Sequence, residues 1–468
     1  MRPTATPTGG TEMAASTLEQ LRARISGQVI TPGDEGYDEA RTVHNAMFDR
    51  RPRAVVRCTS TADVQAVVDF ARDNGLDLAV RGGGHSVPGF GTVDDGIVAD
   101  LSGMRAVTVD PHARTAHAGG GATWGDFNAA TGAHGLASTG GIISTTGVGG
   151  LTLGGGIGYL ARGLGLSCDN LLSAEVVTAD GRAVLASEKE HEDLFWALRG
   201  GGGNFGAVTS FEFALSPVGE IYGGPMFFEL SATRDLLAFF RDFIADAPEQ
   251  YGGFPAFQIA PPLPFIPADR HGEPFIAMVN CWTGSTADGE RIIDRIRAVA
   301  PPVAEMVGPM PYAALNSAFD GLVPPGLQHY WKASFVKELT DEAIDAHVAH
   351  GPKVPVVNST VHIYPINGAC HRVAPDATAF AYRDANFAVV IAGMWPDPAD
   401  NDANTAWVRD YYAATAPLSE EGGYINFMAG DDQERIRANY RGNYDRLVEV
   451  KRAYDPDNLF HLNQNIRP

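Results

Sequence analysis

Clusters of glycine constrain the fold of this chain more than any other feature of its sequence. Three consecutive glycines, Gly82, Gly83 and Gly84, follow a short apolar run, and the imidazole of His85 comes next. Glycine tolerates positive φ angles and lets other groups approach the backbone closely, and successive amides in such a loop can bind an anion. We therefore interpret residues 81–86 as a loop that holds the pyrophosphate of a dinucleotide, with a nucleophile beside it.

A second glycine-rich region, residues 139–165, does not have the composition of a flexible linker. Its glycines alternate with Ile, Val and Leu, whereas solvated linkers are rich in small polar residues. A Rossmann site is excluded at residue 82, because Ser86-Val87-Pro88 follows the glycines and proline opposes the required helix. No Gly-Lys-Ser/Thr of a P-loop occurs either. Dinucleotide binding is therefore expected to use amides from both glycine clusters.

The first half of the chain predicts a mixture of strands and short helices. Apolar runs at 54–58 and 76–80 flank a helix that Thr59 or Ser60 can cap and that Asn74-Gly75 ends, which predicts a βαβ unit. Asp180-Gly181 joins two β-rich runs into a hairpin. Further strands are predicted at 97–101, 107–110, 115–118 and 208–214, and further helices from Thr123 and over 193–198.

Beyond Pro217 glycine becomes less frequent and amphipathic helices alternate with strands. Helices are predicted at 236–245, 289–299, 341–350 and 405–414, and strands at 275–282, 360–366 and 387–394. This pattern indicates helices on one face of an antiparallel sheet, in a domain that covers the substrate. A helix at 432–454 and the segment 459–466 are expected to return to the first domain.

Charge and composition exclude several classes of partner. The formal net charge is −21, and no Lys/Arg run alternates with aromatic residues, so we expect no nucleic-acid and no membrane partner. No run approaches the ~20 apolar residues of a membrane span, and residues 1–16 indicate a loose tail, so a cytoplasmic location is expected. The four cysteines are far apart and predict neither disulfides nor a metal site; they are Cys58, Cys168, Cys281 and Cys370.

Five separated motifs give the chain a resemblance to a known family. In chain order they are Arg-Gly-Gly-Gly-His-Ser (81–86), Thr-Gly-Val-Gly-Gly (146–150) with Gly-Gly-Gly (154–156), Gly-Leu-Ser-Cys-Asp-Asn (165–170), Asp-Leu-Phe-Trp-Ala-Leu-Arg-Gly-Gly-Gly-Gly-Asn-Phe-Gly (193–206), and Tyr-Asp-Pro-Asp-Asn-Leu-Phe (454–460) with Asn-Gln-Asn-Ile (463–466). They resemble the berberine-bridge-enzyme-like FAD-linked oxidases, a branch of the vanillyl-alcohol-oxidase or PCMH-type flavoproteins. The resemblance covers nearly everything from Arg53 to the C-terminus.

The resemblance implies an α+β fold with four parts. Residues 1–30 would form a tail and lead-in, and residues 31–217 a PCMH-type FAD-binding domain of two subdomains. Residues 218–418 would form an inserted substrate domain with an antiparallel sheet and helices. Residues 419–468 would be a C-terminal segment that returns to the FAD domain.

The resemblance also implies FAD as the cofactor, with His85 bonded to the flavin 8α-methyl group. A neutral imidazole is the nucleophile that such a bond requires; the alternative is a histidine that only packs beside the phosphate. Many relatives have a second bond from a cysteine, but Ile143 stands at that position, so a single histidyl link is predicted. The residues expected to bind the cofactor are Arg81, Gly82, Gly83, Gly84, His85, Ser86, Thr139, Gly140, Ser144, Gly147, Val148, Gly149, Gly150, Gly154, Val208, Tyr424, Asn426 and Asn463.

The identity of the catalytic base departs from the family pattern. Members that take a proton from a substrate hydroxyl often use the last tyrosine of a Tyr-x-Asn-Tyr motif, and here Phe427 ends that motif. Phenylalanine cannot accept or donate a proton. Tyr424 and Asn426 remain candidates beside the flavin. His362 is a further candidate base, since an imidazole titrates near neutral pH.

Whether His362 reaches the substrate depends on which face of its strand is turned inward. Because side chains alternate along a strand, either His362 and Tyr364 or Val361 and Ile363 face the cavity. The predicted catalytic residues are therefore Tyr424, Asn426 and, on the first alternative, His362. On the second alternative His362 is a structural residue.

The predicted function is that of an FAD-linked oxidase. A small alcohol, phenolic, polyketide or alkaloid-like molecule gives a hydride to flavin N5, and dioxygen reoxidises the flavin, because no NAD site is visible. Oligosaccharide oxidation is a less favoured alternative, since sugar-oxidising relatives usually keep the second cysteine and the last tyrosine. Two alternatives belong to other classes of protein. One is a flavin-dependent oxygenating or ring-forming enzyme, and the other is a protein that stores flavin without turnover. A monomer or a homodimer is expected.

Overall fold

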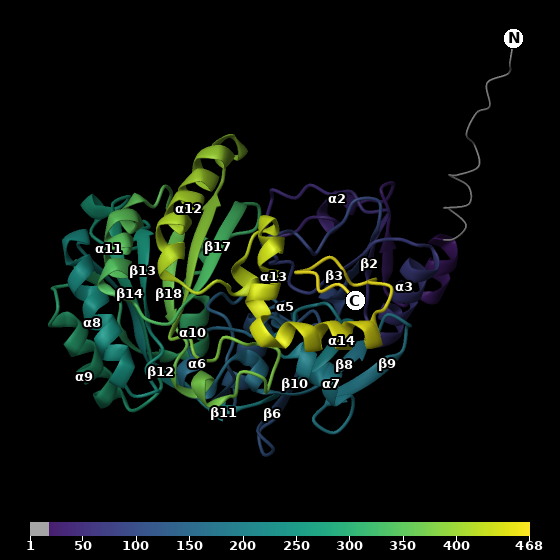
Figure 1. Ribbon diagram of the computed structural model, residues 1–468, viewed down its shortest axis with the longest axis horizontal. Coiled ribbons are helices and arrows are strands. Elements are labelled where there is room, and N and C mark those ends of the chain that lie inside the picture. The colour runs from purple at the N-terminus through teal and green to yellow at the C-terminus, as the bar shows by residue number, and fades with distance from the viewer. Residues whose placement is uncertain (1–17) are drawn as a thin grey trace, which may run out of the picture.

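The first of two small sheets lies in the lobe that carries the glycine loops (Figure 1). The computed structural model describes residues 18–468, so the tail predicted at residues 1–16 lies outside the described residues. The sheet has the order β1-β2-β4-β3, and β2, β4 and β3 are parallel. Because β4 lies between them, the two strands of the predicted βαβ unit are not neighbours. The strands are β1 (Gln28–Ile30), β2 (Ala54–Arg57), β3 (Leu78–Arg81) and β4 (Ile97–Asp100).

Helix α3 (Thr61–Asp73) covers this sheet and begins at the predicted cap. The Ser60 hydroxyl accepts a hydrogen bond from the Asp63 amide at 3.2 Å, which satisfies one of the free donors of the first turn. Its apolar stripe is fully buried against the strands and includes Val64, Val67 and Ala71. The helix ends at Asn74, so both predicted boundaries are confirmed.

The second sheet of this lobe is antiparallel, with the order β5-β6-β10-β8-β9. Its strands are β5 (Val107–Asp110), β6 (Thr115–Gly119), β8 (Leu171–Val177), β9 (Ala183–Ser187) and β10 (Ala207–Ala214). The predicted hairpin is confirmed, since Val177 pairs with Ala183. Helices α4 (Trp124–Gly132) and α7 (Glu192–Leu198) pack in the same lobe, and a capping box at Thr123 starts α4.

The third sheet forms the second lobe and has eight antiparallel strands in the order β15-β12-β14-β13-β18-β19-β17, with β16 paired to β12. They are β12 (Glu220–Phe228), β13 (Phe254–Ile259), β14 (Pro274–Trp282), β15 (Ala304–Glu305), β16 (Gly308–Pro311), β17 (Gln328–Val336), β18 (Thr360–Pro365) and β19 (Phe387–Trp395). Helices α8 (Thr233–Asp246), α9 (Thr286–Arg297), α11 (Asp341–His350) and α12 (Asn401–Thr415) cover its outer face (Figure 1). The predicted α+β architecture with an antiparallel sheet and helices is therefore confirmed.

Short elements connect the two lobes and border the space between them. The strands β7 (Leu136–Ala137) and β11 (Ser216–Pro217) pair with each other. The short helices are α2 (Tyr37–Ala40), α5 (Val148–Leu153), α6 (Ala161–Leu164) and α10 (Tyr312–Ser317). Helix α5 begins in the second glycine cluster, so that cluster is ordered backbone and not a linker.

The C-terminal segment returns to the first lobe, but it is not one helix as predicted for 432–454. It forms α13 (Ile436–Tyr440) and α14 (Tyr444–Tyr454), separated at Arg441, whose φ is 46°. The Arg441 guanidinium binds Asp384 at 2.6 Å and Glu420 at 2.7 Å and lies 3.7 Å from the centre of the Tyr382 ring. These tertiary contacts, and the glycine that follows Arg441, outweigh the local helical pattern.

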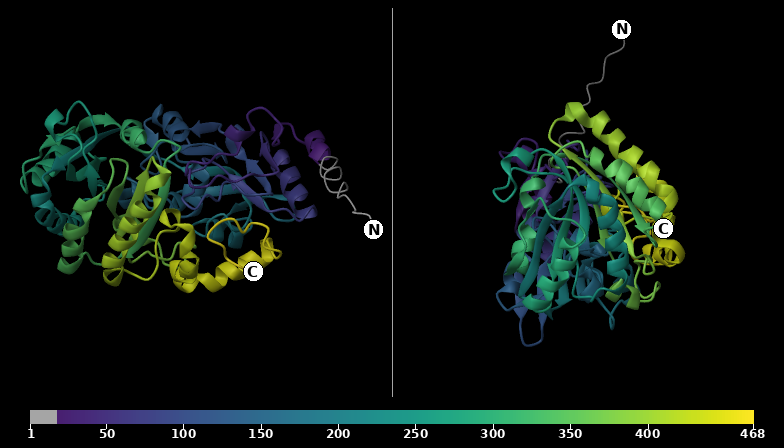
Figure 2. Two further views of the ribbon diagram at one scale, coloured as in Figure 1. Left: turned by 90° about the horizontal axis from the view of Figure 1, so that it is seen from above. Right: turned by 90° about the vertical axis from the view of Figure 1, so that its left-hand side faces the viewer.

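The end of the chain is fastened by a buried lysine. The Lys451 ammonium donates hydrogen bonds to the carbonyl oxygens of Asn204 and Phe460 and pairs with Asp455, and its side chain is fully buried. The Ile466 amide donates to the Asn204 side-chain oxygen at 2.9 Å. The segment therefore runs along both lobes, as the yellow ribbon shows in the view from above (Figure 2).

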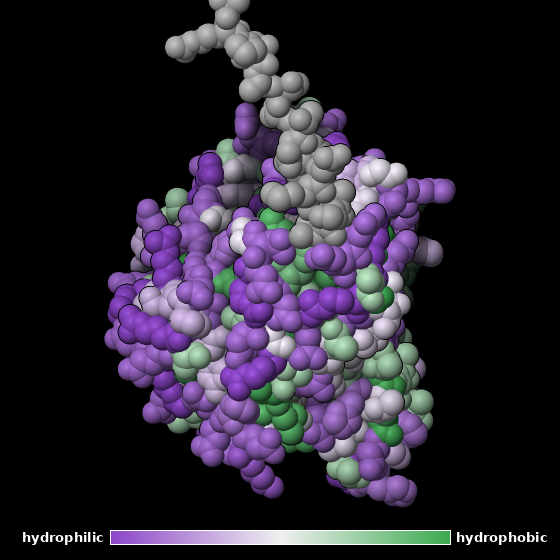
Figure 3. Space-filling model, turned by 90° about the vertical axis from the view of Figure 1, so that its right-hand side faces the viewer, coloured by the Kyte–Doolittle hydropathy of each residue, from purple (hydrophilic) through white to green (hydrophobic). Residues whose placement is uncertain are grey.

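The surface at the end of the first lobe is mostly hydrophilic, with apolar residues scattered singly (Figure 3). Within residues 18–468, no helix has the length and apolar character needed to cross a membrane.

Candidate active site

One cavity joins the glycine loops of the first lobe to the inner face of the third sheet. Its volume is about 600 Å³, within the range of small-molecule and cofactor sites. Both glycine clusters, the C-terminal segment and strands β12, β13, β14, β17, β18 and β19 contribute to its lining. Among the described residues that line it, Arg81 carries the one permanently charged side chain.

The two glycine loops form the cradle at one end of this cavity. They pack backbone against backbone, so that a Cβ atom on Gly83 would overlap the backbone of Gly147, and the reverse. The amides of residues 82–86 donate no hydrogen bond to any other described residue. Five successive free amides at a cavity wall are hydrogen-bond donors available to an anion.

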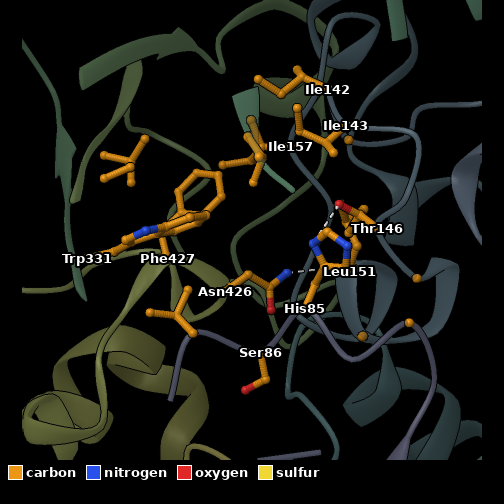
Figure 4. Close-up of a pocket in the computed structure, with 18 of the residues that line it drawn as sticks. His85, Ser86, Ile142, Ile143, Thr146, Leu151, Ile157, Trp331, Asn426 and Phe427 are labelled. Atoms are coloured by element: carbon orange, nitrogen blue, oxygen red, sulfur yellow. Dashed lines mark hydrogen bonds between the residues drawn. The ribbon is translucent and has the colours of Figure 1, made fainter. Parts of the chain in front are cut away.

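His85 projects from the first loop into the cavity, close to Thr146 (Figure 4). Its Nε2 atom lies 3.1 Å from the Thr145 hydroxyl oxygen. The His44 ring stacks on it at 3.9 Å between ring centres, and His329 follows at 5.1 Å from His44. Burial, together with His44 and His329, holds the pKa of His85 well below its usual value. The imidazole is therefore neutral at physiological pH, in the state of a nucleophile.

The residue at the position where many relatives have a second bond to the flavin also faces the cavity. Ile143 is part of the lining, close to Ile142 and Ile157 (Figure 4). Cys168 is fully buried away from it, with its sulfur 3.7 Å from an Asp169 carboxylate oxygen. Burial raises the pKa of the Cys168 thiol well above its usual value. This cysteine is therefore an inert structural thiol.

Most of the predicted cofactor residues meet at the cavity. Those that line it are Arg81, Gly82, Gly83, Gly84, His85, Ser86, Gly147, Gly149, Gly150, Val208, Tyr424, Asn426 and Asn463. The Arg81 guanidinium is already engaged, since it donates to the Ala40 and Thr42 carbonyl oxygens and pairs with Asp100 at 3.0 Å. Arg81 thus fastens the start of the glycine loop to its neighbours.

The remaining predicted residues lie behind the lining and support it. The Thr139 hydroxyl donates to the Gly165 carbonyl oxygen at 2.7 Å, and Gly140 packs on the Trp124 ring. Ser144 binds Asp320 of the other lobe through its amide, at 2.9 Å, and through its hydroxyl. Two more lie next to lining residues: Val148 is fully buried, and Gly154 packs on the Asn426 side chain.

Tyr424 has an unusual set of partners at its hydroxyl oxygen. This oxygen accepts hydrogen bonds from the Gly156 amide at 2.9 Å, the Ile157 amide at 3.3 Å and the Asn426 side-chain nitrogen at 2.8 Å. Burial raises the pKa of Tyr424 to about 12, although the three donors act in the opposite direction. The phenol is therefore protonated, and its own proton has no acceptor among the described residues. Tyr424 also lines the cavity, so its hydroxyl is available to a bound molecule.

Strand β18 turns His362 and Tyr364 toward the cavity, and Val361 and Ile363 toward the helices on the outer face. His362 Nδ1 lies 2.6 Å from the Tyr364 hydroxyl oxygen. Burial lowers the pKa of His362 to about 3 and raises that of Tyr364 well above its usual value. The pair is therefore neutral, and His362 has a free lone pair or N–H for a substrate.

An aromatic wall lies between His362 and the C-terminal segment. The Phe427 ring lies 4.7 Å from the Tyr424 ring and 5.9 Å from each of the Tyr364 and Trp331 rings. Figure 4 shows Trp331 and Phe427 together on the side of the pocket away from His85. Asn426 lies between this pair and His85. Trp331 and Gln258 were not among the predicted site residues. Period-two alternation places them on inward faces, but nothing local tells which face of those strands is inward.

Comparisons with known proteins agree with this site. Residues 52–187 match a family model described as FAD binding domain, and residues 423–467 match one described as berberine and berberine like. An uncharacterized FAD-linked oxidoreductase of Bacillus subtilis is 31% identical over 460 residues, which cover 96% of this chain and 98% of that one.

Two solved structures show the same fold over almost the whole chain. The 6-hydroxy-D-nicotine oxidase of Arthrobacter nicotinovorans has a TM-score of 0.84 at 29% identity, covering 95% of this chain and 98% of that one. A glucooligosaccharide oxidase of Acremonium strictum, described with 6-S-cysteinyl, 8α-N1-histidyl FAD, has a TM-score of 0.84 at 25% identity, covering 97% and 99%.

Fold and site together define a flavoprotein with a PCMH-type FAD-binding domain. The chain belongs to the berberine-bridge-enzyme-like family of FAD-linked oxidoreductases. It is therefore an enzyme that binds FAD. The free amides at residues 82–86 and the neutral His85 fit this cofactor, because they supply hydrogen-bond donors for a pyrophosphate and a nucleophile within the same loop.

Proposed function

We propose that the protein oxidises an uncharged aromatic, polyketide or alkaloid-like alcohol, with FAD attached through His85 alone and dioxygen as the electron acceptor. The observation that carries the proposal is a single cavity that runs from the glycine cradle to an apolar wall bearing a neutral histidine. Oligosaccharides are disfavoured, because that wall holds few polar groups to replace the water around a sugar. A cytoplasmic monomer or homodimer is part of the proposal.

Different residues of the cavity would bind different parts of FAD. The amides of residues 82–86 and the loop at Gly147, Gly149 and Gly150 would hold the pyrophosphate, and Asn463 and Val208 would line the rest of the cofactor site. When bound, FAD takes a hydride from a substrate carbon and later passes two electrons to an acceptor. Ile143 supplies no sulfur, so the attachment would have one bond.

His362 would accept a hydrogen bond from the substrate hydroxyl and orient it, because burial lowers its pKa to about 3 and makes it a weaker base than the near-neutral imidazole expected from the sequence. It is neutral, faces the cavity and is held by Tyr364 at 2.6 Å. Phe427 cannot serve as a base, and its ring instead forms part of the apolar wall. The Tyr424 hydroxyl, fixed by three N–H donors, would donate its proton to an oxygen or nitrogen of the bound molecules, and Asn426 keeps it in place.

Anaerobic mixing of the purified yellow protein with aromatic alcohols tests the reaction class. Bleaching of the flavin absorption band, followed by its return when air is admitted, is expected. Product formed anaerobically without bleaching would instead support a ring-forming enzyme, and product that forms only after air is admitted, with no bleaching beforehand, would support an oxygenating one. The replacement of the usual tyrosine by Phe427 makes this class the second candidate. Bleaching by an oligosaccharide and by no aromatic compound would contradict the proposed substrate class.

A further inference from the structure

The inner face of the third sheet forms a flat floor in the middle of the cavity. Ala256 on β13 lies between Ala277 on β14 and His362 on β18, and Val390 on β19 follows His362. These neighbours, apart from His362, have short apolar side chains, and all of them line the cavity. A floor of Ala and Val beside one imidazole accommodates a planar ring system better than a branched or puckered one.

Three polar residues interrupt the apolar lining next to this floor. Thr360 lies two residues before His362 on the same face of β18, and Gln258 on β13 is its direct neighbour in the sheet. Asn358 precedes β18 and lines the same region. None of the three contributes to the cofactor site described above.

Each of the three residues already donates one hydrogen bond to the backbone. The Thr360 hydroxyl donates its one proton to the Phe257 carbonyl oxygen at 2.9 Å, and the Asn358 side-chain nitrogen donates to the Leu322 carbonyl oxygen at 2.8 Å. The Gln258 side-chain nitrogen donates to the carbonyl oxygen of Val357. These bonds fix the orientation of both amides. The groups left for a ligand are the two amide oxygens, the lone pairs of the Thr360 hydroxyl and one N–H on each amide.

An uncharged cluster with three acceptor oxygens and two amide N–H groups favours a ligand group that can donate a hydrogen bond. A carboxylate or phosphate, which only accepts hydrogen bonds, would leave the three oxygens without donors, and an ammonium group would find no carboxylate among the described lining residues. A phenolic hydroxyl or a ring N–H matches the cluster. Transfer of such a group from water to the site would cost little free energy, because an acceptor in the site replaces the hydrogen bond that the group made to water.

We propose that Gln258, Thr360 and Asn358 form a subsite that binds a hydroxyl or N–H group at the far end of a flat, uncharged substrate of at least two fused rings. The proposal rests on the proposed function, because His362 marks the reacting end. Two residues along a strand span about 7 Å. The reacting carbon beside His362 and the donor beside Thr360 are therefore separated by the width of two fused aromatic rings.

The test uses two naphthalene alcohols and the holoenzyme. 6-Hydroxy-2-naphthalenemethanol carries a donor at the required distance from its carbinol carbon, and 6-methoxy-2-naphthalenemethanol has the same shape without the donor. The rate of anaerobic flavin bleaching at rising concentration gives the dissociation constant of each. The hydroxy compound is expected to bind 10- to 100-fold more tightly to the wild type.

Two variants with side chains of nearly the same shape show which residues cause the preference for the hydroxy compound. Thr360→Val and Gln258→Met should each reduce the preference for the hydroxy compound at least threefold and leave the affinity for the methoxy compound unchanged. Thr108→Val, at an exposed position on β5, is the matched control and should retain the preference. The Gln258 variant serves if Thr360→Val fails to fold, since the two side chains bond to different backbone carbonyls.

Equal affinities of the two compounds in the wild type, or a preference that persists in both variants, overturns the subsite. If other aromatic alcohols bleach the flavin while neither naphthalene compound binds, the subsite is wrong and the proposed function stands. If no aromatic alcohol bleaches the flavin, the proposed function fails and the subsite fails with it.

Discussion

At the scale of single residues, the neutral state of His85 is the property on which the proposed cofactor attachment depends. The Thr145 hydroxyl lies beside its Nε2 atom and the His44 ring stacks on its face. A protonated imidazole has no lone pair for bond formation, and burial together with the two neighbouring histidines disfavours that form. The surroundings thus keep the imidazole in the state that a nucleophile needs.

The first prediction concerns this attachment. In the wild type, acid precipitation should leave the yellow colour on the protein, whereas His85→Ala should release it into the supernatant, because the predicted bond has no other attachment atom. His117→Ala, at an exposed strand position, is the control and should keep its colour. Yellow wild-type supernatant would contradict the covalent bond, and absorption and mass spectra of the denatured protein check it independently.

The second prediction concerns the missing second anchor. Ile143 lines the cavity, so Ile143→Cys should place a thiol beside the flavin and give a fraction of protein with a second covalent bond. In a His85→Ala background this variant should retain part of the flavin after acid precipitation. Cys168→Ala should leave attachment unchanged, because its thiol is buried away from the cavity. Release of all flavin from the Ile143→Cys, His85→Ala protein would show that residue 143 does not reach the cofactor.

The third prediction concerns His362 as a residue that orients the substrate hydroxyl. His362→Phe should lower kcat/KM by roughly 5-fold, because it removes one hydrogen bond worth about 1 kcal/mol. Because burial lowers the pKa of His362 to about 3, the imidazole stays unprotonated on acidification from pH 8 to pH 5. The wild-type kcat/KM should therefore not fall over this range through protonation of His362. A decline with a midpoint near pH 6.5 would indicate that the histidine is exposed and not in the described site.

At the scale of elements, helices α11 and α12 are joined by a buried polar contact on the outer face of the third sheet. His347 Nδ1 lies 2.8 Å from the Tyr411 hydroxyl oxygen, and both side chains are buried. Burial, with His350 nearby, lowers the pKa of His347 to about 4. Protonation of His347 is therefore less favourable in the folded protein than in the unfolded chain, where the pKa of histidine is about 6.5.

The fourth prediction follows from this difference. Between pH 6.5 and pH 4 the unfolded chain binds a proton that the folded state does not, so His347 lowers the free energy of unfolding by about 1.4 kcal/mol per pH unit as the pH falls. Above pH 6.5 both states are neutral and the contribution is constant. His347→Gln should flatten the slope by that amount, measured by denaturant unfolding at pH 7, 6 and 5. An unchanged slope would mean that His347 titrates alike in both states.

Elements with strong local signals were predictable, and elements shaped by distant contacts were not. The cap at Ser60 and the apolar stripe of α3 are encoded within fifteen residues, and the turn and strands of the β8–β9 hairpin within seventeen. The break between α13 and α14 depends on Arg441 reaching Asp384 and Glu420, which no pattern around Arg441 reveals. The same holds for β4, whose insertion between β2 and β3 is a matter of sheet order.

At the scale of the whole molecule, the C-terminal segment completes both lobes and the cavity between them. It contributes Tyr424, Asn426, Asn463 and Gln464 to the lining. Lys451, fully buried, holds it against the first lobe through a hydrogen bond to the Asn204 carbonyl oxygen, and its bonds to Asp455 and Phe460 fix the fold of the segment itself. We therefore expect cofactor binding to be coupled to the docking of the last fifty residues.

The fifth prediction tests that coupling. Lys451→Met should destabilise the protein by about 3–5 kcal/mol, because it leaves the Asp455 carboxylate buried without its cation. The variant should also lose flavin on dilution more readily in the His85→Ala background. Arg452→Met, at an exposed position one residue on, is the control and should change stability by less than about 0.5 kcal/mol. Equal unfolding midpoints for both variants would show that Lys451 does not anchor the segment.

The cofactor half of the site was largely predictable from sequence, and the substrate half was not. The glycine loops are local motifs, so residues such as Gly83, His85 and Gly150 could be named in advance, and all three line the cavity. The opposite wall collects single residues from strands that are far apart in the chain, such as Gln258 and Trp331. Alternation placed His362 and Tyr364 on one face, but only the packing of the helices shows which face is inward.

The contact between Gly83 and Gly147 limits which residues of the site can change during evolution. Any side chain at either position would push the two loops apart, so the cradle offers almost no room for variation. The floor of the third sheet already carries side chains, such as those of Ala256, Ala277 and Val390, and a substitution there alters the floor without disturbing the cradle. New substrates can therefore be acquired by exchanging residues on one lobe while the other keeps its cofactor.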